Sequence, residues 1–228
     1  MDISRLVIAV DGWSSTGKST FAKLVAKEFG LLYLDSGALY RGVTLFAQEE
    51  GLVSEDGEVD PRLEEALRSL DLHFGEGGKL YSSDRCIEEQ IRSLKVSGQV
   101  SPVSAVAYVR DFVNARLHES GRDGGIVMDG RDIGTTVFPD ADIKIFMTAS
   151  AEVRARRRYD EMIAKGDAPT MEEVARNLRE RDYIDSHREV SPLSKAPDAI
   201  ELDNSSMTLP EEIDWLKALV KARYGVCR

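Results

Sequence analysis

A glycine-rich stretch near the start of the chain has the residue types and spacing of a phosphate-binding loop. Residues 12–20, "GWSSTGKST", fit the pattern G-x-x-x-x-G-K-[ST]. Its two glycines let the backbone curl so that successive N–H groups point at phosphate oxygens, and a helix beginning near Lys18 adds the positive end of its dipole. Lys18 can reach the β- and γ-phosphates, and the Ser19 hydroxyl can join a Mg²⁺ shell. The predicted ATP-binding residues are Gly12, Trp13, Ser14, Ser15, Thr16, Gly17, Lys18, Ser19 and Thr20.

Two carboxylates could complete the environment of that magnesium ion. Asp129 ends the apolar run "GIVMDG" and Asp35 ends "LLYLD", so both follow predicted strands. Either one could bind Mg²⁺ through water, beside Ser19. For each residue taken alone, a turn or a cap at the strand end explains the position equally well. The metal-site prediction is therefore Ser19, with Asp129 or Asp35 acting through water.

A phosphate loop does not say where the phosphoryl group goes, so the rest of the chain has to. The sequence contains neither N-K-x-D, which a GTP-dependent switch uses to recognise guanine, nor the L-S-G-G-Q of transporter ATPases. It has arginines outside the loop instead: Arg41 follows "DSGALY", and Arg131 follows a strand end. Arg181, Asp185 and Arg188 have the spacing i, i+4, i+7, which predicts one helix face. An exposed Arg181–Asp185 salt bridge is the alternative.

The distribution of charge favours a small anionic acceptor. The net charge is −10, which disfavours a nucleic-acid polymer as partner. Against this acidic background, arginines are concentrated in one region. They are Arg154, Arg156, Arg157, Arg158, Arg176, Arg179, Arg181 and Arg188. Arginine binds phosphate oxygens in pairs, and an acceptor that is itself a phosphate would be repelled by ATP unless positive groups neutralise it. The pattern indicates phosphoryl transfer to a nucleoside monophosphate.

Apolar runs alternating with helical patterns predict an α/β fold. The expected strands are 5–10, 31–37, 125–130, 143–148 and 199–205, with a helix at 37–51 and an amphipathic helix at the C-terminus. Such alternation is typical of a parallel sheet with helices on both faces. Between about 54 and 100, short alternating runs around 75–78 predict a small antiparallel insert. Helices at about 88–95 and 101–120 are expected to follow, and 164–173 to form a surface stretch between two helices.

Other features give the expected setting of the protein. No stretch approaches the ~20 apolar residues of a membrane span, and the N-terminus lacks the pattern of a secretion signal. Cys86 and Cys227 have no metal-binding spacing, which favours reduced thiols in a cytoplasmic protein. The histidines are expected to have no catalytic role. With no exposed apolar heptad, we expect a monomer.

Several motifs together resemble bacterial-type cytidylate kinases, of the P-loop nucleoside monophosphate kinase family. Beyond the phosphate loop, the resemblance is carried by "LDSGALYR" (34–41), "GRDIGTTVFPDA" (130–141), "IKIFMTASAEVRARRR" (143–158) and "ERDYIDSHREVSPL" (180–193). It covers essentially the whole chain, 1–228, as a single domain. It implies a P-loop NTPase-type five-stranded parallel sheet, an inserted acceptor-binding subdomain at about 54–100 and a short lid at about 154–172.

The resemblance also implies the reaction and the site. The γ-phosphoryl group of ATP would pass to CMP, and also to dCMP, with Mg²⁺, giving CDP or dCDP and ADP. The implied CMP-binding residues are Arg41, Arg131 and Arg188 at the phosphate, Ser36, Arg110 and Asp132 at the cytosine, and Ser101, Arg181 and Asp185 at the ribose. The catalytic set would be Lys18, Arg131, Arg188, Arg157 and Arg158.

Three points stay open at this stage. Ser101 precedes Pro102 and could equally be the N-cap of a helix. Arg157 and Arg158 resemble the lid arginines that contact ATP phosphates on closure, whereas Arg154 and Arg156 could as well be solvated. Trp13 replaces the proline that the family commonly has in the loop.

Two competing hypotheses for the function remain. One is a kinase for UMP or AMP, and the other is an ATP-dependent switch with no acceptor.

Overall fold

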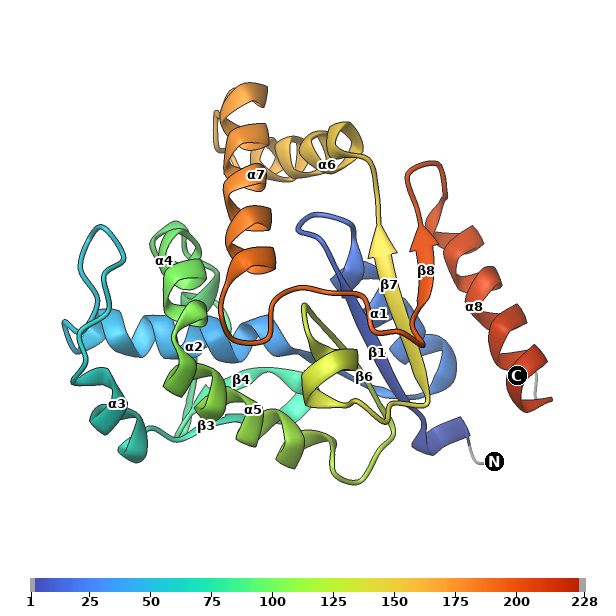
Figure 1. Cartoon of the computed structure of the whole chain (residues 1–228), viewed down its shortest axis with the longest axis horizontal. Helices are drawn as coiled ribbons and strands as arrows, with labels where there is room; N and C mark the ends of the chain where they lie inside the picture. The colour runs from blue at the N-terminus through green and yellow to red at the C-terminus, as the bar shows by residue number, and fades with distance from the viewer. Residues whose placement is uncertain (1–2, 226–228) are drawn as a thin grey trace.

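A five-stranded parallel sheet lies at the centre of the fold. The computed structural model describes residues 3–225, and the strand order is β2-β6-β1-β7-β8 (Figure 1). The strands are β1 Val7–Gly12, β2 Leu32–Asp35, β6 Ile126–Gly130, β7 Ile143–Thr148 and β8 Ile200–Asp203. Four lie within their predicted segments, β1 continues two residues beyond the predicted 5–10, and every neighbouring pair is parallel. The predicted α/β class and five-stranded sheet are confirmed.

Helices cover both faces because the central strand is apolar on both sides. Ile8 and Val10 pack with α1 (Lys18–Phe29) and α8 (Leu209–Tyr224). Ala9 points to the opposite face, which α2 (Ser36–Glu49) and α5 (Ala107–Gly121) cover. This alternation follows from the two-residue period of a strand, and burial on both faces is typical of parallel sheets. All of these residues in β1 are fully buried.

The turn from β1 into α1 depends on two glycines for different reasons. Gly12 has φ of 147°, and a Cβ there would lie 2.1 Å from the Met147 carbonyl oxygen on β7. The phosphate loop therefore leaves the sheet at a point where only glycine fits between the strands. Gly17 has φ of 92° and caps the start of α1 in the left-handed region. The loop geometry is consequently fixed by backbone packing as well as by its sequence pattern.

The segment between α2 and α5 contains the small antiparallel element that the sequence predicts. Its three strands pair in the order β3-β4-β5, and Leu72 and Leu80 of that sheet pack against Gly42 on α2. Its elements are α3 Leu63–Ala66, η2 Leu67–Ser69, β3 Leu72–Phe74, η3 Glu76–Gly78, β4 Leu80–Ser82, β5 Arg85–Cys86, η4 Gln90–Arg92 and α4 Leu94–Ala105. The apolar residues of the insert join the core on the face of the large sheet that α2 covers, and they belong to the same core cluster.

Two predicted helices in this region have wrong boundaries. Only a short 3₁₀ turn, Gln90–Arg92, falls inside 88–95, because α4 begins later with the Ser93 hydroxyl accepting from the Val96 N–H. The predicted helix 101–120 is two helices, since Val106 is extended between α4 and α5. Ser101 lies inside α4, so its interpretation as an N-cap is wrong. Pro102 near the end of α4 lacks the N–H that would continue the ladder.

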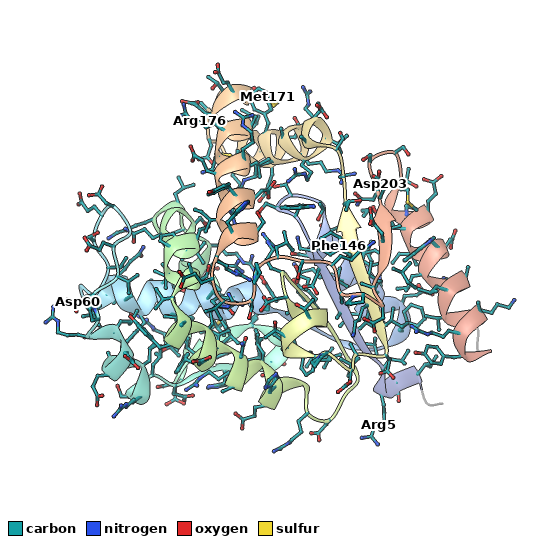
Figure 2. The ribbon with its side chains drawn as sticks, viewed as in Figure 1. Arg5, Asp60, Phe146, Met171, Arg176 and Asp203 are labelled. Carbon is teal, nitrogen blue, oxygen red and sulfur yellow. The ribbon has the colours of Figure 1, made fainter. Side chains whose placement is uncertain are left out.

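Two crossing helices project beyond the carboxyl ends of β7 and β8. They are α6 (Ala151–Ala164) and α7 (Met171–His187), joined by the predicted surface stretch (Figure 1). Their own small core contains Ala155, Val174 and Leu178. Met171 and Arg176 lie toward the outer end of α7, away from the sheet (Figure 2). This pair of helices touches the rest of the molecule chiefly at the site described below.

The remaining predictions concern single features. α8 begins with a capping box between Thr208 and Glu211 and ends at Gly225, as its amphipathic pattern predicts. A single π-helical turn, η5 Ile133–Val137, follows β6. Cys86 is exposed, and Cys227 lies outside the described residues. Among residues 3–225, no helix is long and apolar enough to cross a membrane.

Candidate active site

The phosphate loop holds its lysine against its own backbone. The Lys18 ammonium group donates to the carbonyl oxygens of Gly12 at 2.9 Å and of Trp13 at 2.6 Å. Burial lowers the pKa of Lys18 well below its usual value, and the nearby Arg131 adds to that effect. The Thr16 hydroxyl also donates to the Trp13 carbonyl. Trp13 therefore contributes through its backbone, which explains how a bulky side chain is tolerated at this position.

Carboxylates from two neighbouring strands meet beside the loop. The Ser19 hydroxyl donates to Asp129 at 2.8 Å, and the Tyr33 hydroxyl donates to its other oxygen, also at 2.8 Å. Burial and the proximity of Asp35 raise the pKa of Asp129. Burial alone would raise the pKa of Asp35 too, but Arg41 outweighs it and the net shift is downward. Asp35 also caps α2, which confirms the structural interpretation of this residue, whereas its role at a metal ion stays a prediction.

These groups suit a magnesium ion that is shared with a nucleotide. Within residues 3–225 there is no cluster of three or more acidic, histidine or cysteine ligands. Magnesium commonly takes only one or two protein groups and completes its octahedron with water and substrate phosphates. The Ser19 hydroxyl and the Asp129 carboxylate, adjacent at the loop, provide that minimal set. A cation near them would also offset the repulsion between Asp129 and Asp35.

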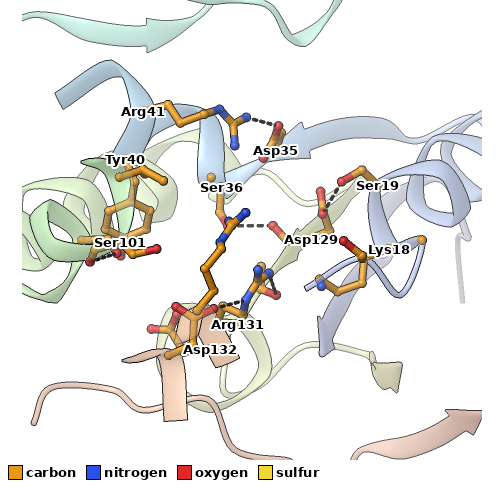
Figure 3. A pocket seen from close by; sticks show the side chains of 18 of the residues that line it. Lys18, Ser19, Asp35, Ser36, Tyr40, Arg41, Ser101, Asp129, Arg131 and Asp132 are labelled. Atoms are coloured by element: carbon orange, nitrogen blue, oxygen red, sulfur yellow. Dashed lines mark hydrogen bonds and ion pairs between the residues drawn. The ribbon is translucent and has the colours of Figure 1, made fainter. Parts of the chain in front are cut away.

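A pocket of about 310 Å³ opens between the phosphate loop, α2, α4 and α7 (Figure 3). Its volume is in the range of small-molecule sites. Arg110, from α5, is fully buried and lies behind the pocket wall. The lining includes every other residue of the predicted CMP set: Ser36, Arg41, Ser101, Arg131, Asp132, Arg181, Asp185 and Arg188. From the loop, Ser15, Gly17, Lys18, Ser19 and Thr20 line it, as do Asp35 and Asp129.

Arg131 connects the acceptor side of the pocket to the phosphate loop. Its Nε donates to Asp185 at 2.7 Å, and its Nη2 donates to the Ser14 hydroxyl at 2.9 Å. Burial opposes the charge of Arg131, but the Asp185 carboxylate outweighs it and raises the pKa. The same contact holds the pKa of Asp185 low despite its burial. Asp185 therefore pairs with Arg131 across the pocket, and the predicted alternative, an exposed Arg181–Asp185 salt bridge, is wrong.

Asp132 is the centre of a second, deeper ion network. Its two oxygens accept from Arg110 Nη2 at 2.5 Å and from Arg188 Nη2 at 3.2 Å. Arg188 is not on the helix face predicted for it, because α7 ends at His187 and Arg188 continues as extended chain. Two donations to the Ser191 carbonyl hold its guanidinium there. Arg181, Asp185 and Arg188, which were predicted to share a helix face, all line the pocket, although Arg188 reaches it from the chain after α7.

Arg181 differs from the other arginines of the pocket. Among residues 3–225 it has no hydrogen bond or ion pair, and its Nε is buried without a partner. Burial, together with the nearby Arg131, lowers its pKa to about 10, so it still carries its charge at neutral pH. Arg41 donates to Asp35 at 2.6 Å, but its Nε is also buried and unpartnered. The pocket thus presents positive charge that the protein does not neutralise, which favours an anion there.

The lid arginines separate into different environments. Arg154 donates to Asp182 at 2.5 Å and to the Ser14 carbonyl, so the interpretation of Arg154 as solvated is wrong. Arg156 is exposed and pairs with Asp160. Arg157 donates to the Thr16 carbonyl of the loop. Arg158 pairs with Glu161 and does not line the pocket described above. Contact of Arg157 and Arg158 with ATP phosphates remains a prediction for a closed lid.

Sequence reasoning missed several residues at the site. Tyr40 lines the pocket, stacks on the Arg110 guanidinium at 5.2 Å and has a buried hydroxyl without a partner. Arg92, from the insert, lines the pocket and lies 3.7 Å from Asp35. Asp182 accepts from the Ser14 N–H. Tyr40 belongs to the quoted motif "DSGALYR" and could have been found there; Arg92 lies in the segment that lacks a motif.

Comparison with known proteins identifies the family to which this geometry belongs. The family model described as cytidylate kinase matches residues 8–222. The chain belongs to the cytidylate kinase family. A cytidylate kinase of Bacteroides thetaiotaomicron is 49% identical over 219 residues, covering 94% of this chain and 96% of that one. One of Bacteroides fragilis is 50% identical over 221 residues, covering 95% and 96%.

A solved structure shares the overall fold at low sequence identity. An uncharacterised protein from Eubacterium ventriosum superposes with a TM-score of 0.51 at 11% identity, covering 96% of this chain and 99% of that one. At that identity the likeness concerns the fold alone. The family match spans nearly the full chain, so it includes the phosphate loop, the insert, α6 and α7.

Proposed function

We propose that the protein transfers the γ-phosphoryl group of ATP to CMP and dCMP. Membership of the cytidylate kinase family supports the reaction. The single structural observation that carries it is Arg181, a half-buried pocket side chain that has no hydrogen bond or ion pair among residues 3–225 and whose Nε is buried. A charge left unpaired in this way costs stability unless a ligand compensates it. A bound acceptor nucleotide, with its ribose against Arg181 and its anionic phosphate near the loop, would do so.

The acceptor base would be recognised by the Asp132 network. A carboxylate has about four lone-pair sites, and Arg110 and Arg188 occupy two of them. Asp132 can therefore still accept from the 4-amino group of cytosine. Uracil has a carbonyl oxygen at that position, which would face the carboxylate without a proton between them. Ser36 donates to the Asp129 carbonyl and keeps lone pairs for the base.

The acceptor phosphate would lie among Arg41, Arg131 and Arg188, with Asp185 and Ser101 at the ribose. Arg131 is tied to Ser14 of the phosphate loop, so one guanidinium is positioned between donor and acceptor. No protein nucleophile is needed, because an oxygen of the acceptor phosphate attacks directly. Positive groups then stabilise the charge that spreads over the transferred phosphoryl oxygens. Lys18 would move from its two loop carbonyls onto the β- and γ-phosphates.

Magnesium would be held by Ser19, with Asp129 acting through water. The ion neutralises the β- and γ-phosphate oxygens when bound. Hydrogen bonds from the Ser19 and Tyr33 hydroxyls keep this carboxylate oriented toward the loop. Asp35 already forms an ion pair with Arg41, so we assign Asp35 to the acceptor side of the pocket and not to the metal.

The insert and the lid would complete the site around the substrates. We propose that residues 54–100 form an acceptor-binding subdomain, which Arg92 and Val100 support by lining the pocket from that side. We propose that residues 154–172 form a lid whose closure excludes water that would otherwise hydrolyse ATP. The protein would act as a cytoplasmic monomer on small nucleotides, without a nucleic-acid polymer as partner.

The test is CMP-dependent formation of ADP from MgATP. We expect turnover with CMP and dCMP that exceeds the rate without acceptor by several orders of magnitude. A rate of ATP hydrolysis that is the same with and without an acceptor would support the switch hypothesis instead. Efficient turnover with UMP or AMP alone would keep the kinase activity and refute the proposed role of Asp132.

A further inference from the structure

A second pocket lies beside the phosphate loop and shares part of its wall with the first. Its volume is about 340 Å³. Its lining comes from the loop, from α6 and from the turn between β8 and α8. The residues are Ser15, Gly17, Thr20, Arg157, Asn204, Met207, Leu209 and Glu212. A nucleotide whose phosphates occupy the loop has its base within reach of this pocket, which places the donor base there under the proposed function.

One wall of this second pocket carries a buried carboxylate with an unused oxygen. Glu212 is 2% exposed. Its Oε1 accepts from Asn204 Nδ2 at 2.8 Å, whereas Oε2 has no hydrogen-bond partner among residues 3–225. Burial raises the pKa of Glu212. Buried polar atoms are nearly always paired, so an unpaired carboxylate oxygen at a pocket wall points to a donor supplied by a ligand.

The orientation of the groups around Glu212 is fixed by a chain of hydrogen bonds. Arg157 Nη1 donates to Asn204 Oδ1 at 3.0 Å, and its Nη2 donates to the Asn204 carbonyl at 2.9 Å. Asn204 Nδ2 therefore faces the other way and donates both to Glu212 and to the Thr16 carbonyl. Since Asn204 can only donate toward Glu212, Oε1 is fixed as an acceptor, and Oε2 is a second acceptor in the ionised carboxylate.

We propose that Glu212 determines the donor base, by accepting a hydrogen bond from the 6-amino group of adenine. Hypoxanthine and guanine have a carbonyl oxygen at that position, which would face the carboxylate acceptor to acceptor. A site built to pair one polar group rejects the analogue that lacks it, because its own buried group is left unpaired. The inference rests on the proposed kinase function and adds the residue that selects the donor.

A purely structural role for Glu212 makes a different prediction. Its carboxylate lies in the first turn of α8, where negative charge interacts favourably with the helix dipole. Loss of that interaction would lower the melting temperature and would affect all phosphoryl donors alike. A change in the preference between donors is therefore the readout that separates recognition of the base from support of the helix.

The test compares ATP and ITP as donors at saturating CMP. In wild type, kcat/KM for ATP should exceed that for ITP by about 10- to 100-fold, the worth of one charge-assisted hydrogen bond. In Glu212→Gln, the amide oxygen must accept from Asn204, which leaves the amide nitrogen as a donor facing the pocket. The ATP/ITP ratio should then fall at least about tenfold. Asp214→Asn, which removes an exposed charge from the same helix, should keep the wild-type ratio.

Two results would overturn the proposal. One is a wild-type enzyme with no preference for ATP over ITP; the other is an unchanged ratio in folded Glu212→Gln. Calorimetric binding of ADP and IDP without any acceptor gives the same comparison independently of catalysis. If CMP-dependent turnover is absent, the kinase function fails, but a preference for ADP that is lost in Glu212→Gln still supports recognition of the base.

Discussion

Replacing Asp132 by asparagine keeps the shape of the side chain and removes its charge at the centre of the acceptor site. Asp132 is buried and accepts from Arg110 at 2.5 Å and from Arg188 at 3.2 Å, through different oxygens. Asparagine has one acceptor oxygen, so its amide nitrogen must face one of the two guanidinium groups. Arg110 is fully buried, and breaking such a pair by truncation costs about 3–5 kcal/mol. We expect a folded protein with a lower melting temperature.

The effect on acceptor choice follows from the same geometry. A hydrogen bond from the cytosine amino group to a carboxylate contributes about 1.5–3 kcal/mol, so kcat/KM for CMP should fall by about 10- to 100-fold. The amide nitrogen of Asp132→Asn can instead donate to the 4-carbonyl of uracil. The variant should therefore use CMP less well and UMP better, and the ratio of kcat/KM for CMP to that for UMP should fall at least about tenfold.

The assay is coupled detection of ADP with CMP and UMP, on protein shown to be folded by circular dichroism. Asp140→Asn is the matched control, because Asp140 is an exposed acid on the same segment after β6. It should keep the wild-type ratio. An equal fall of kcat/KM for CMP and UMP in Asp132→Asn would refute the reasoning, since Asp132 would then serve only as the counter-ion of Arg110.

Three further predictions concern charge at the site. Arg181→Met should leave the melting temperature unchanged or raised, because it removes a half-buried charge that has no ion pair among residues 3–225, and should lower kcat/KM for CMP about 10- to 100-fold; a lower melting temperature with unchanged kinetics would contradict this. Asp11 on β1 accepts from the Ile133 and Gly134 N–H groups, and burial raises its pKa to about 6 from an ordinary 3.8, so the folded protein keeps the proton to a higher pH than the unfolded chain does. In urea titrations, the free energy of unfolding of the wild type should thus fall by about 3 kcal/mol relative to that of Asp11→Asn as pH rises from about 4 to about 6. The same pH dependence in both proteins would contradict this prediction. Chelation of Mg²⁺ should abolish turnover, and Ser19→Ala should raise the Mg²⁺ concentration for half-maximal rate; an unchanged requirement would remove Ser19 from the metal site.

The sheet could be predicted from sequence because its strands are buried on both faces and bounded by glycine or aspartate. Such runs have no helical period, and alternation with helices leaves few arrangements other than a parallel sheet. The phosphate loop was equally clear, since its spacing is a geometric requirement. The close approach of Gly12 to the Met147 carbonyl could not be predicted, because it depends on the distance between β1 and β7.

Errors in the prediction arose where a local pattern competes with tertiary structure. Ser101 followed by Pro102 has the pattern of a helix start, yet α4 already begins at Leu94, with Ser93 as its N-cap. The i, i+4, i+7 spacing placed Arg188 on α7, but the chain leaves the helix one residue earlier and Arg188 reaches Asp132 from a loop. The partners within the site were also beyond the sequence. Nothing in it says that Asp185 pairs with Arg131 and leaves Arg181 without a counter-ion.

The measurement that tests the central claim most directly is ADP formation from MgATP with CMP, dCMP, UMP, AMP and GMP, beside a reaction without acceptor. The account predicts fast turnover with CMP and dCMP, slow turnover with the other three, and almost none without an acceptor. A rate that is the same with every acceptor and without any would contradict it. The arginines around the pocket would then have no phosphate acceptor to bind.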